Sequence, residues 1–100
     1  MVKHIILWRL KEELSEAEIK EVTANAKAAL EALGGKIEGL VSMSVITEGL
    51  PSSNCHMMLD SAFESEAALG AYQKHPLHVA AANSFVRPFA EVRLCMDYEA

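Results

Sequence analysis

The sequence has few of the residues that keep a chain unfolded. Only three prolines and five glycines occur among its 100 residues, and hydrophobic residues make up 51% of the chain. Disordered and low-complexity proteins show the opposite balance, so the sequence excludes that class. A chain of this length can bury roughly two-thirds of its surface, which suffices for a single core. We therefore expect one domain over residues 1–100, without a linker.

Positive charge is also scarce. Nine Lys and Arg stand against 14 Asp and Glu, for a formal net charge of −5, and no basic cluster is interleaved with aromatics. Nucleic-acid backbones and anionic membranes would repel such a chain. The apolar run at the amino terminus is far shorter than a membrane span or the core of an export signal. The sequence thus predicts a cytoplasmic protein with small-molecule partners and no contact with nucleic acid or membrane.

Motifs for metal, phosphate and nucleophile chemistry are missing as well. No Gly-rich phosphate loop and no Gly-x-Ser-x-Gly elbow is present. The potential metal ligands lack the close Cys-x-x-Cys or His-x-x-x-His spacing of zinc sites, so we expect no metal. These ligands are His4, Cys55, His56, His75, His78 and Cys95. Both cysteines lie in apolar, strand-like surroundings, where free thiols usually behave as small buried hydrophobes, and a disulfide is unneeded.

Hydrophobic periodicity, caps and turns predict seven elements in one order. The strongest signals are the capping box of Ser15 and Glu18, the helix stop Gly34-Gly35 and the helix break at Pro76. The expected elements are a strand at 2–10, a helix at 15–33, a hairpin of strands within 37–48 and 55–63, helices on either side of Pro76, and a strand at 91–98. This order resembles the ferredoxin-like split βαβ, an α+β fold with a four-stranded antiparallel sheet under helices.

The first strand is apolar at the centre of both its faces. His4, Ile6 and Trp8 lie on one face, and Ile5 and Leu7 lie on the other. Helices would cover only one of these faces, so the other needs a second layer. Twofold packing of two sheets is the simplest cover. We therefore expect a homodimer that forms through the open face of the sheet.

The stretch from Tyr72 to His78 holds two of the four histidines and one of the two tyrosines, around Pro76. Imidazole titrates near neutral pH and phenol can donate a hydrogen bond, so this stretch suggests a site. His78 follows the break and could point between helices and sheet. As a general base it would contribute roughly 10²–10⁴-fold in rate. The alternatives are that His78 caps a helix and that Tyr72 is a packing residue.

The other histidines have more modest interpretations. His4 shares a strand face with Trp8, so both side chains lie in the core or on the floor of a pocket, where they could bind substrate. A core histidine that makes hydrogen bonds is the commoner outcome for His4. His75 is pushed out of helical geometry by Pro76, and we expect it to fix the turn.

Four segments together resemble the stress-responsive A/B barrel domain family, known as Dabb. They are Val2–Leu7, Phe63–Ser65, Tyr72–Val79 and Asp97–Tyr98. The ends are generic, but Tyr-x-x-His-Pro-x-His at this distance from an amino-terminal Lys-His is fairly specific. The resemblance implies a dimeric α+β barrel without an organic cofactor.

The same resemblance implies roles for three residues. In a plant branch that includes olivetolic acid cyclase, a histidine and a tyrosine transfer protons while a linear polyketide closes its ring by an aldol reaction. These positions correspond to His78 and Tyr72 here, and His4 matches the histidine of the first strand. The plant cyclase has pocket-lining aromatics on its first helix. This chain has instead the alanines Ala24, Ala26, Ala28 and Ala29.

We therefore expect a dimeric stress-responsive A/B barrel domain that binds a small carbonyl or polyketide-like compound. His78 and Tyr72 would carry cyclase-like acid-base chemistry. One alternative is a non-catalytic stress-response dimer whose histidines only stabilise the bend before the last helix. Another is a cofactor-free monooxygenase of quinol-like substrates, because a distantly similar architecture occurs in such enzymes.

Overall fold

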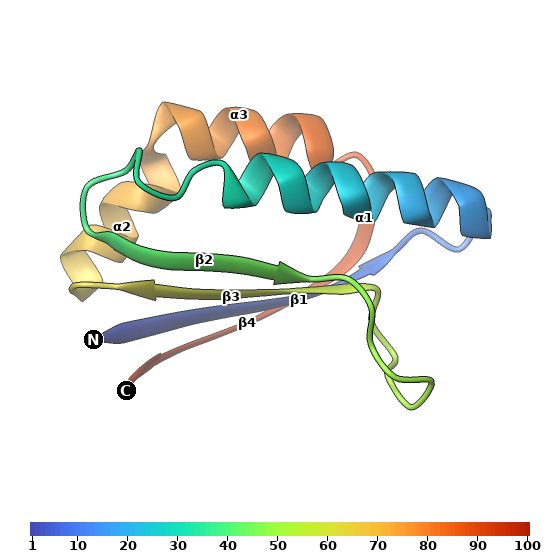
Figure 1. The fold of residues 1–100 in the computed structure, drawn as a ribbon, viewed down its shortest axis with the longest axis horizontal. Coiled ribbons are helices and arrows are strands. Elements are labelled where there is room, and N and C mark those ends of the chain that lie inside the picture. Colours follow the sequence, from blue (N-terminus) through green and yellow to red (C-terminus); the bar gives the residue numbers. More distant parts are fainter.

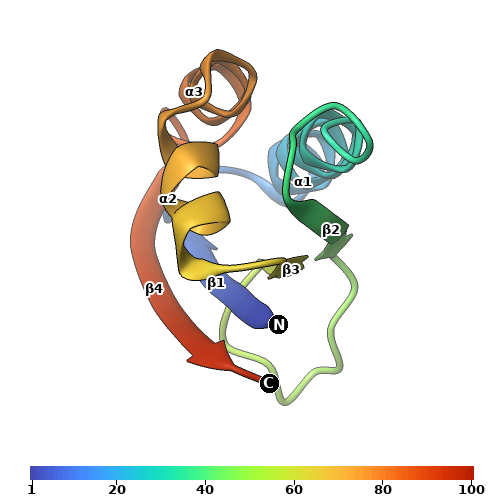
Figure 2. The same ribbon diagram turned by 90° about the vertical axis from the view of Figure 1, so that its left-hand side faces the viewer.

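Seven elements follow one another in the order expected from the sequence, and the computed structural model describes all 100 residues. They are β1 (Val2–Leu10), α1 (Glu16–Glu31), β2 (Leu40–Ile46), β3 (Met57–Phe63), α2 (Glu66–Lys74), α3 (Pro76–Phe85) and β4 (Ala90–Glu99). The strands form one antiparallel sheet in the order β2-β3-β1-β4. All three helices lie on one side of it and the other side is open (Figure 1, Figure 2). The predicted ferredoxin-like α+β fold is confirmed.

The central strand β1 carries most of the core. Its residues alternate between buried and less buried, with His4, Ile6 and Trp8 facing the helices. Ile6 pairs with Leu59 of β3 on one side and with Cys95 of β4 on the other. Residues from distant parts of the chain therefore reach the same layer between sheet and helices.

Helix α1 begins as its sequence predicts. The side chain of Ser15 accepts a hydrogen bond from the amide of Glu18, and the Glu18 carboxylate accepts one from the amide of Ser15. This reciprocal capping box satisfies two amides that the first turn leaves free. The buried stripe of α1 consists of Val22, Thr23, Ala26 and Leu30, and it covers the sheet. No helix of the structure combines the length and the apolar character that crossing a bilayer demands.

The break between α2 and α3 is built around His75. The His75 backbone is extended, as expected before a proline, with φ −65° and ψ 133°. Its Nδ1 accepts a hydrogen bond from the amide of Leu77, so it caps α3, and Pro76 occupies the first turn. The prediction that His75 fixes the turn is confirmed. His78 is not the cap and its side chain is available for another role.

Three details differ from the sequence-based expectations. The alternate spacing of Val41, Met43 and Val45 predicts one shared strand face, but a bulge between Leu40 and Ser42 shifts the register and leaves Val41 exposed. Helical spacing puts Phe85 among the apolar positions of α3, but Phe85 is also exposed, at the last residue of the helix. Cys95 is exposed on the edge strand β4 rather than buried, and both cysteines are free thiols.

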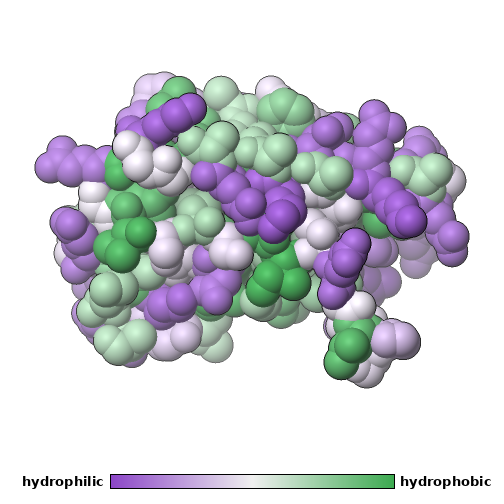
Figure 3. Space-filling model, in the orientation of Figure 1, coloured by the Kyte–Doolittle hydropathy of each residue, from purple (hydrophilic) through white to green (hydrophobic).

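The open face of the sheet is apolar. Leu94, Met96 and Tyr98 of β4 are 60%, 65% and 46% exposed, and Ile46 of β2 is 45% exposed. A separate apolar site, Leu50, lies in the loop between β2 and β3, which stands out from the body of the molecule (Figure 3). An exposed apolar sheet face of this kind marks an interaction surface.

Candidate active site

A cavity of about 440 Å³ lies between the sheet and α3. Its lining includes every residue that the sequence suggested for a site, namely His4, Trp8, Tyr72 and His78. The remaining lining residues are Ile6, Leu30, Leu59, Ala82, Val86, Arg87, Ala90, Glu91, Val92 and Arg93. From α1 only Leu30 contributes, so this helix places no aromatic side chain in the lining, and none of its alanines lines the cavity. The structure therefore brings the four suggested residues together around one cavity.

Tyr72 and His78 stack against each other across the α2–α3 break. Their ring centroids are 4.2 Å apart, with the planes inclined by 43°. No hydrogen bond joins the two side chains. The Tyr72 hydroxyl and Nδ1 of His78 are buried and have no hydrogen-bond partner in the protein. Buried polar atoms are nearly always paired, so two unpaired atoms beside one cavity indicate a place for a ligand.

Burial sets the protonation of this pair. It raises the pKa of Tyr72 to about 12, against a smaller opposite effect of the Arg93 charge. It lowers the pKa of His78 to about 4, and the charges of Arg87, His4, Arg93 and His75 lower it further. At neutral pH the pair therefore consists of a neutral imidazole, which can accept a proton, and a neutral phenol, which can donate a hydrogen bond.

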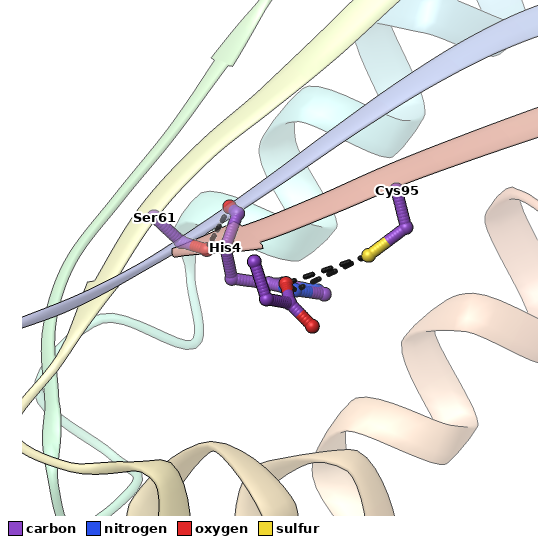
Figure 4. Close-up of polar contacts among 4 residues, drawn as sticks. His4, Ser61 and Cys95 are labelled. Atoms are coloured by element: carbon purple, nitrogen blue, oxygen red, sulfur yellow. Dashed lines mark hydrogen bonds and ion pairs between the residues drawn. The ribbon is translucent and has the colours of Figure 1, made fainter. Parts of the chain in front are cut away.

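His4 is held in one orientation from two sides. Its Nδ1 donates a hydrogen bond to the carboxylate of Asp97, and its backbone carbonyl accepts one of 2.7 Å from the hydroxyl of Ser61 (Figure 4). The side chain is only 2% exposed and its Nε2 has no partner in the protein. His4 is thus both a satisfied core histidine and part of the cavity wall, with Tyr72 at a centroid distance of 6.3 Å.

Cys95 joins the pair of His4 and Asp97 at the edge of the sheet. Its thiol lies 3.4 Å from Asp97 Oδ1 and 3.9 Å from His4 Nδ1, and all three ligand atoms lie within 4.8 Å of one another (Figure 4). Burial and the neighbouring Asp97 raise the pKa of this thiol, so it is not a thiolate at neutral pH. Linear spacing did not predict this cluster, because β1 and β4 are neighbours only in the sheet.

Sequence reasoning also missed Asp97 as the partner of His4 and the charged residues of the cavity, Arg87, Glu91 and Arg93. Strand alternation held a usable signal for β4, since Glu91, Arg93, Cys95 and Asp97 occupy alternate positions. The sequence pattern does not give the pairing of β1 with β4, which places Arg93 opposite Trp8 and Asp97 opposite His4. His56 lies elsewhere, where its Nδ1 accepts a hydrogen bond from the amide of Leu10.

The chain resembles several proteins of known structure. No curated protein matches the chain. A dimeric protein of unknown function with a ferredoxin-like fold from Bacteroides fragilis is 33% identical, with a TM-score of 0.92 over 99% of this chain and 95% of that one. A Dabb family protein from Mesorhizobium loti is 27% identical, with a TM-score of 0.74 over 99% and 95% of the two chains.

A hydroxynitrile lyase from Passiflora edulis is 22% identical, with a TM-score of 0.71 over 97% of this chain and 90% of that one, a likeness of fold. The sequence model of the stress-responsive A/B barrel domain matches residues 2–100. This match covers all seven elements and the Tyr72–His78 motif. The chain therefore belongs to the stress-responsive A/B barrel domain family.

Proposed function

We propose that the protein binds a small carbonyl compound in the cavity and transfers protons on it, with His78 as general base and Tyr72 as hydrogen-bond donor. The observation that carries this proposal is the pair of buried, unpaired polar atoms on these two residues, beside a cavity large enough for a small molecule. A bound carbonyl oxygen can accept a hydrogen bond from the Tyr72 hydroxyl, and the His78 imidazole can take a proton from the carbon next to that carbonyl.

The chemical step balances within the site. Nδ1 or Nε2 of neutral His78 removes a proton from the carbon next to the carbonyl, and the electron pair of the broken C–H bond moves to the carbonyl oxygen. The Tyr72 hydroxyl donates a hydrogen bond to the enolate oxygen that forms. The His78 imidazolium can then return its proton to the enolate carbon. Alternatively, that carbon attacks a second carbonyl of the same substrate, whose C=O π bond breaks toward oxygen, and this oxygen takes the proton from the imidazolium, which is a cyclase-like aldol closure.

His4 and Trp8 would bind the substrate in this scheme. Asp97 occupies Nδ1 of His4 and so leaves Nε2 as the nitrogen that can meet a ligand. Trp8 offers an apolar wall and is only 6% exposed. Together they would offer the substrate one hydrogen-bonding nitrogen and one apolar surface on β1.

Proton exchange at carbon tests the mechanism without knowledge of the natural substrate. In D₂O, the wild-type protein should exchange the protons next to the carbonyl of 2-hexanone, followed by ¹H NMR. His78→Gln should slow this exchange by at least about 10²-fold, the usual contribution of a general base. Tyr72→Phe should slow it by a similar factor, because it removes the donor to the enolate oxygen.

A matched control is His56→Gln, which changes a histidine outside the cavity and should leave exchange unchanged. Exchange that persists in both His78→Gln and Tyr72→Phe would contradict the mechanism. If 2-hexanone binds without exchange, the protein is a binder, as the non-catalytic alternative requires.

We also propose that two copies of the chain pair through the open faces of their sheets. Support comes from the dimeric Bacteroides fragilis relative and from the exposed apolar residues of β4. The cavity lies on the opposite, helix-covered side of the sheet. Pairing would therefore cover the apolar face and leave the cavity accessible.

A further inference from the structure

The cavity is positively charged in a chain that is negatively charged as a whole. Arg87 and Arg93 contribute two positive charges to its lining, and Glu91 contributes one negative charge. The whole chain has a formal net charge of −5. Neither arginine is in an ion pair, since the salt bridges of the protein join Met1 to Glu99, Lys3 to Asp60, His4 to Asp97 and Lys27 to Glu31.

The two arginines line the same cavity as the two residues with unpaired polar atoms, Tyr72 and His78. Arg93 lies on the helix-facing side of β4, directly opposite Trp8. Arg87 follows the C-terminal end of α3, where its guanidinium donates a hydrogen bond to the side chain of Asn83. Both charges act on His78, and that of Arg93 also acts on Tyr72. The cations therefore point at the same space as the proposed acid-base pair.

We propose that the carbonyl compound bound in this cavity also carries a carboxylate, which Arg93 holds while Arg87 adds positive charge at the mouth. This inference rests on the proposed function and names its substrate class. A guanidinium matches a carboxylate with two parallel hydrogen bonds, which fixes the direction in which the ligand enters. The carboxylate stays near the mouth, and the carbonyl reaches inward to Tyr72.

The carboxylate of the ligand would also change the pKa of the general base, His78. The charged and titratable groups that face His78 are His4 from β1, Glu91 and Arg93 from β4, Tyr72 from α2, Arg87 after α3, and His75 at the start of its own helix. A negative ligand among them offsets the positive charges that disfavour the imidazolium. Ligand binding should therefore be coupled to a rise in the pKa of His78, which makes it a stronger base when substrate is present.

A matched pair of probes tests the carboxylate directly. 4-Oxohexanoate and its methyl ester share one carbon skeleton and differ in charge. NMR titration of wild-type protein should give a dissociation constant at least about tenfold lower for the acid, which corresponds to about 1.4 kcal/mol. Arg93→Gln should remove most of this difference. Arg93→Lys should keep part of it, because charge remains but the paired hydrogen bonds do not.

The control variant is Lys74→Gln, which removes the same charge at the exposed end of α2 outside the cavity lining and should preserve the preference. The imidazole resonances of His78 report the expected rise in its pKa. 4-Oxohexanoate should raise the pH midpoint of their titration, whereas the methyl ester should not. Equal affinity for acid and ester, or a preference that survives Arg93→Gln, overturns the carboxylate assignment and leaves the carbonyl site standing. If neither probe perturbs His78 at millimolar concentration, both the assignment and the proposed function fail.

Discussion

Tyr72 illustrates how function and stability conflict at a single residue. Its ring is fully buried against Phe63, with centroids 4.9 Å apart, yet its hydroxyl has no partner in the protein. An unsatisfied buried hydroxyl costs about 1–3 kcal/mol. We expect Tyr72→Phe to increase the free energy of unfolding by about 1 kcal/mol, measured by urea denaturation at fixed protein concentration, while it slows proton exchange.

The control for Tyr72→Phe is Tyr72→Leu, which removes the buried aromatic ring as well as the hydroxyl and should decrease the free energy of unfolding. If Tyr72→Phe also decreased it, the hydroxyl would have a stabilising role that the cavity does not explain.

His78 should make stability depend on pH in the acidic range. Its pKa is about 4 in the folded protein against 6.5 for an ordinary histidine, so between these values the unfolded chain binds the proton more readily. The stability linked to the neutral imidazole is present above about pH 6.5 and is lost as the pH falls toward 4. Thermal denaturation over this range should show a shallower pH dependence in His78→Gln than in the wild type. Parallel curves would contradict the low pKa.

At the scale of elements, two glycines have different reasons for being glycine. Gly39 is required by its backbone conformation and a close contact, whereas Gly70 only lowers the helix propensity of α2. Gly39 precedes β2 with φ +85°, and a Cβ there would lie 2.5 Å from Cβ of Ala68 on α2. Gly70 lies within α2, and a Cβ there would meet nothing within 4 Å. Gly39→Ala should therefore destabilise the protein by at least about 2 kcal/mol, through left-handed strain and overpacking.

The matched variant Gly70→Ala should stabilise the protein by about 0.5–1 kcal/mol, because alanine is the better helix former. Urea denaturation of both variants checks the pair. A Gly39→Ala variant as stable as the wild type would show that the contact between the turn at Gly39 and α2 does not constrain the fold.

At the scale of the whole molecule, the proposed dimer makes the open sheet face testable. Leu94 and Met96 of β4 are the most exposed hydrophobic residues of this face, so a charge there would be buried without a partner in the dimer. Leu94→Glu should convert the dimer to a monomer in analytical ultracentrifugation. Leu77→Glu changes a 44% exposed leucine on α3 and should leave the dimer intact. A Leu94→Glu dimer would place the interface elsewhere.

The element order was predictable because its signals are local. The capping box at Ser15, the extended residue before Pro76 and the alternation of β1 depend on neighbours a few positions away, and each is found in the structure. Val41 shows the limit of such signals, since a bulge shifted it out of the expected face without any change in its hydrophobic pattern.

The sequence by itself determined the fold class, the family resemblance and the set of residues that could carry proton chemistry, because these depend on residue type and short spacing. Only the tertiary structure decided which of them share a cavity and which charges act on them. His4 and Asp97 are 93 positions apart and meet because β1 and β4 pair in the sheet. Long-range pairing also brings Arg93 to the cavity and leaves Tyr72 and His78 stacked but unbonded, and no local pattern encodes that geometry.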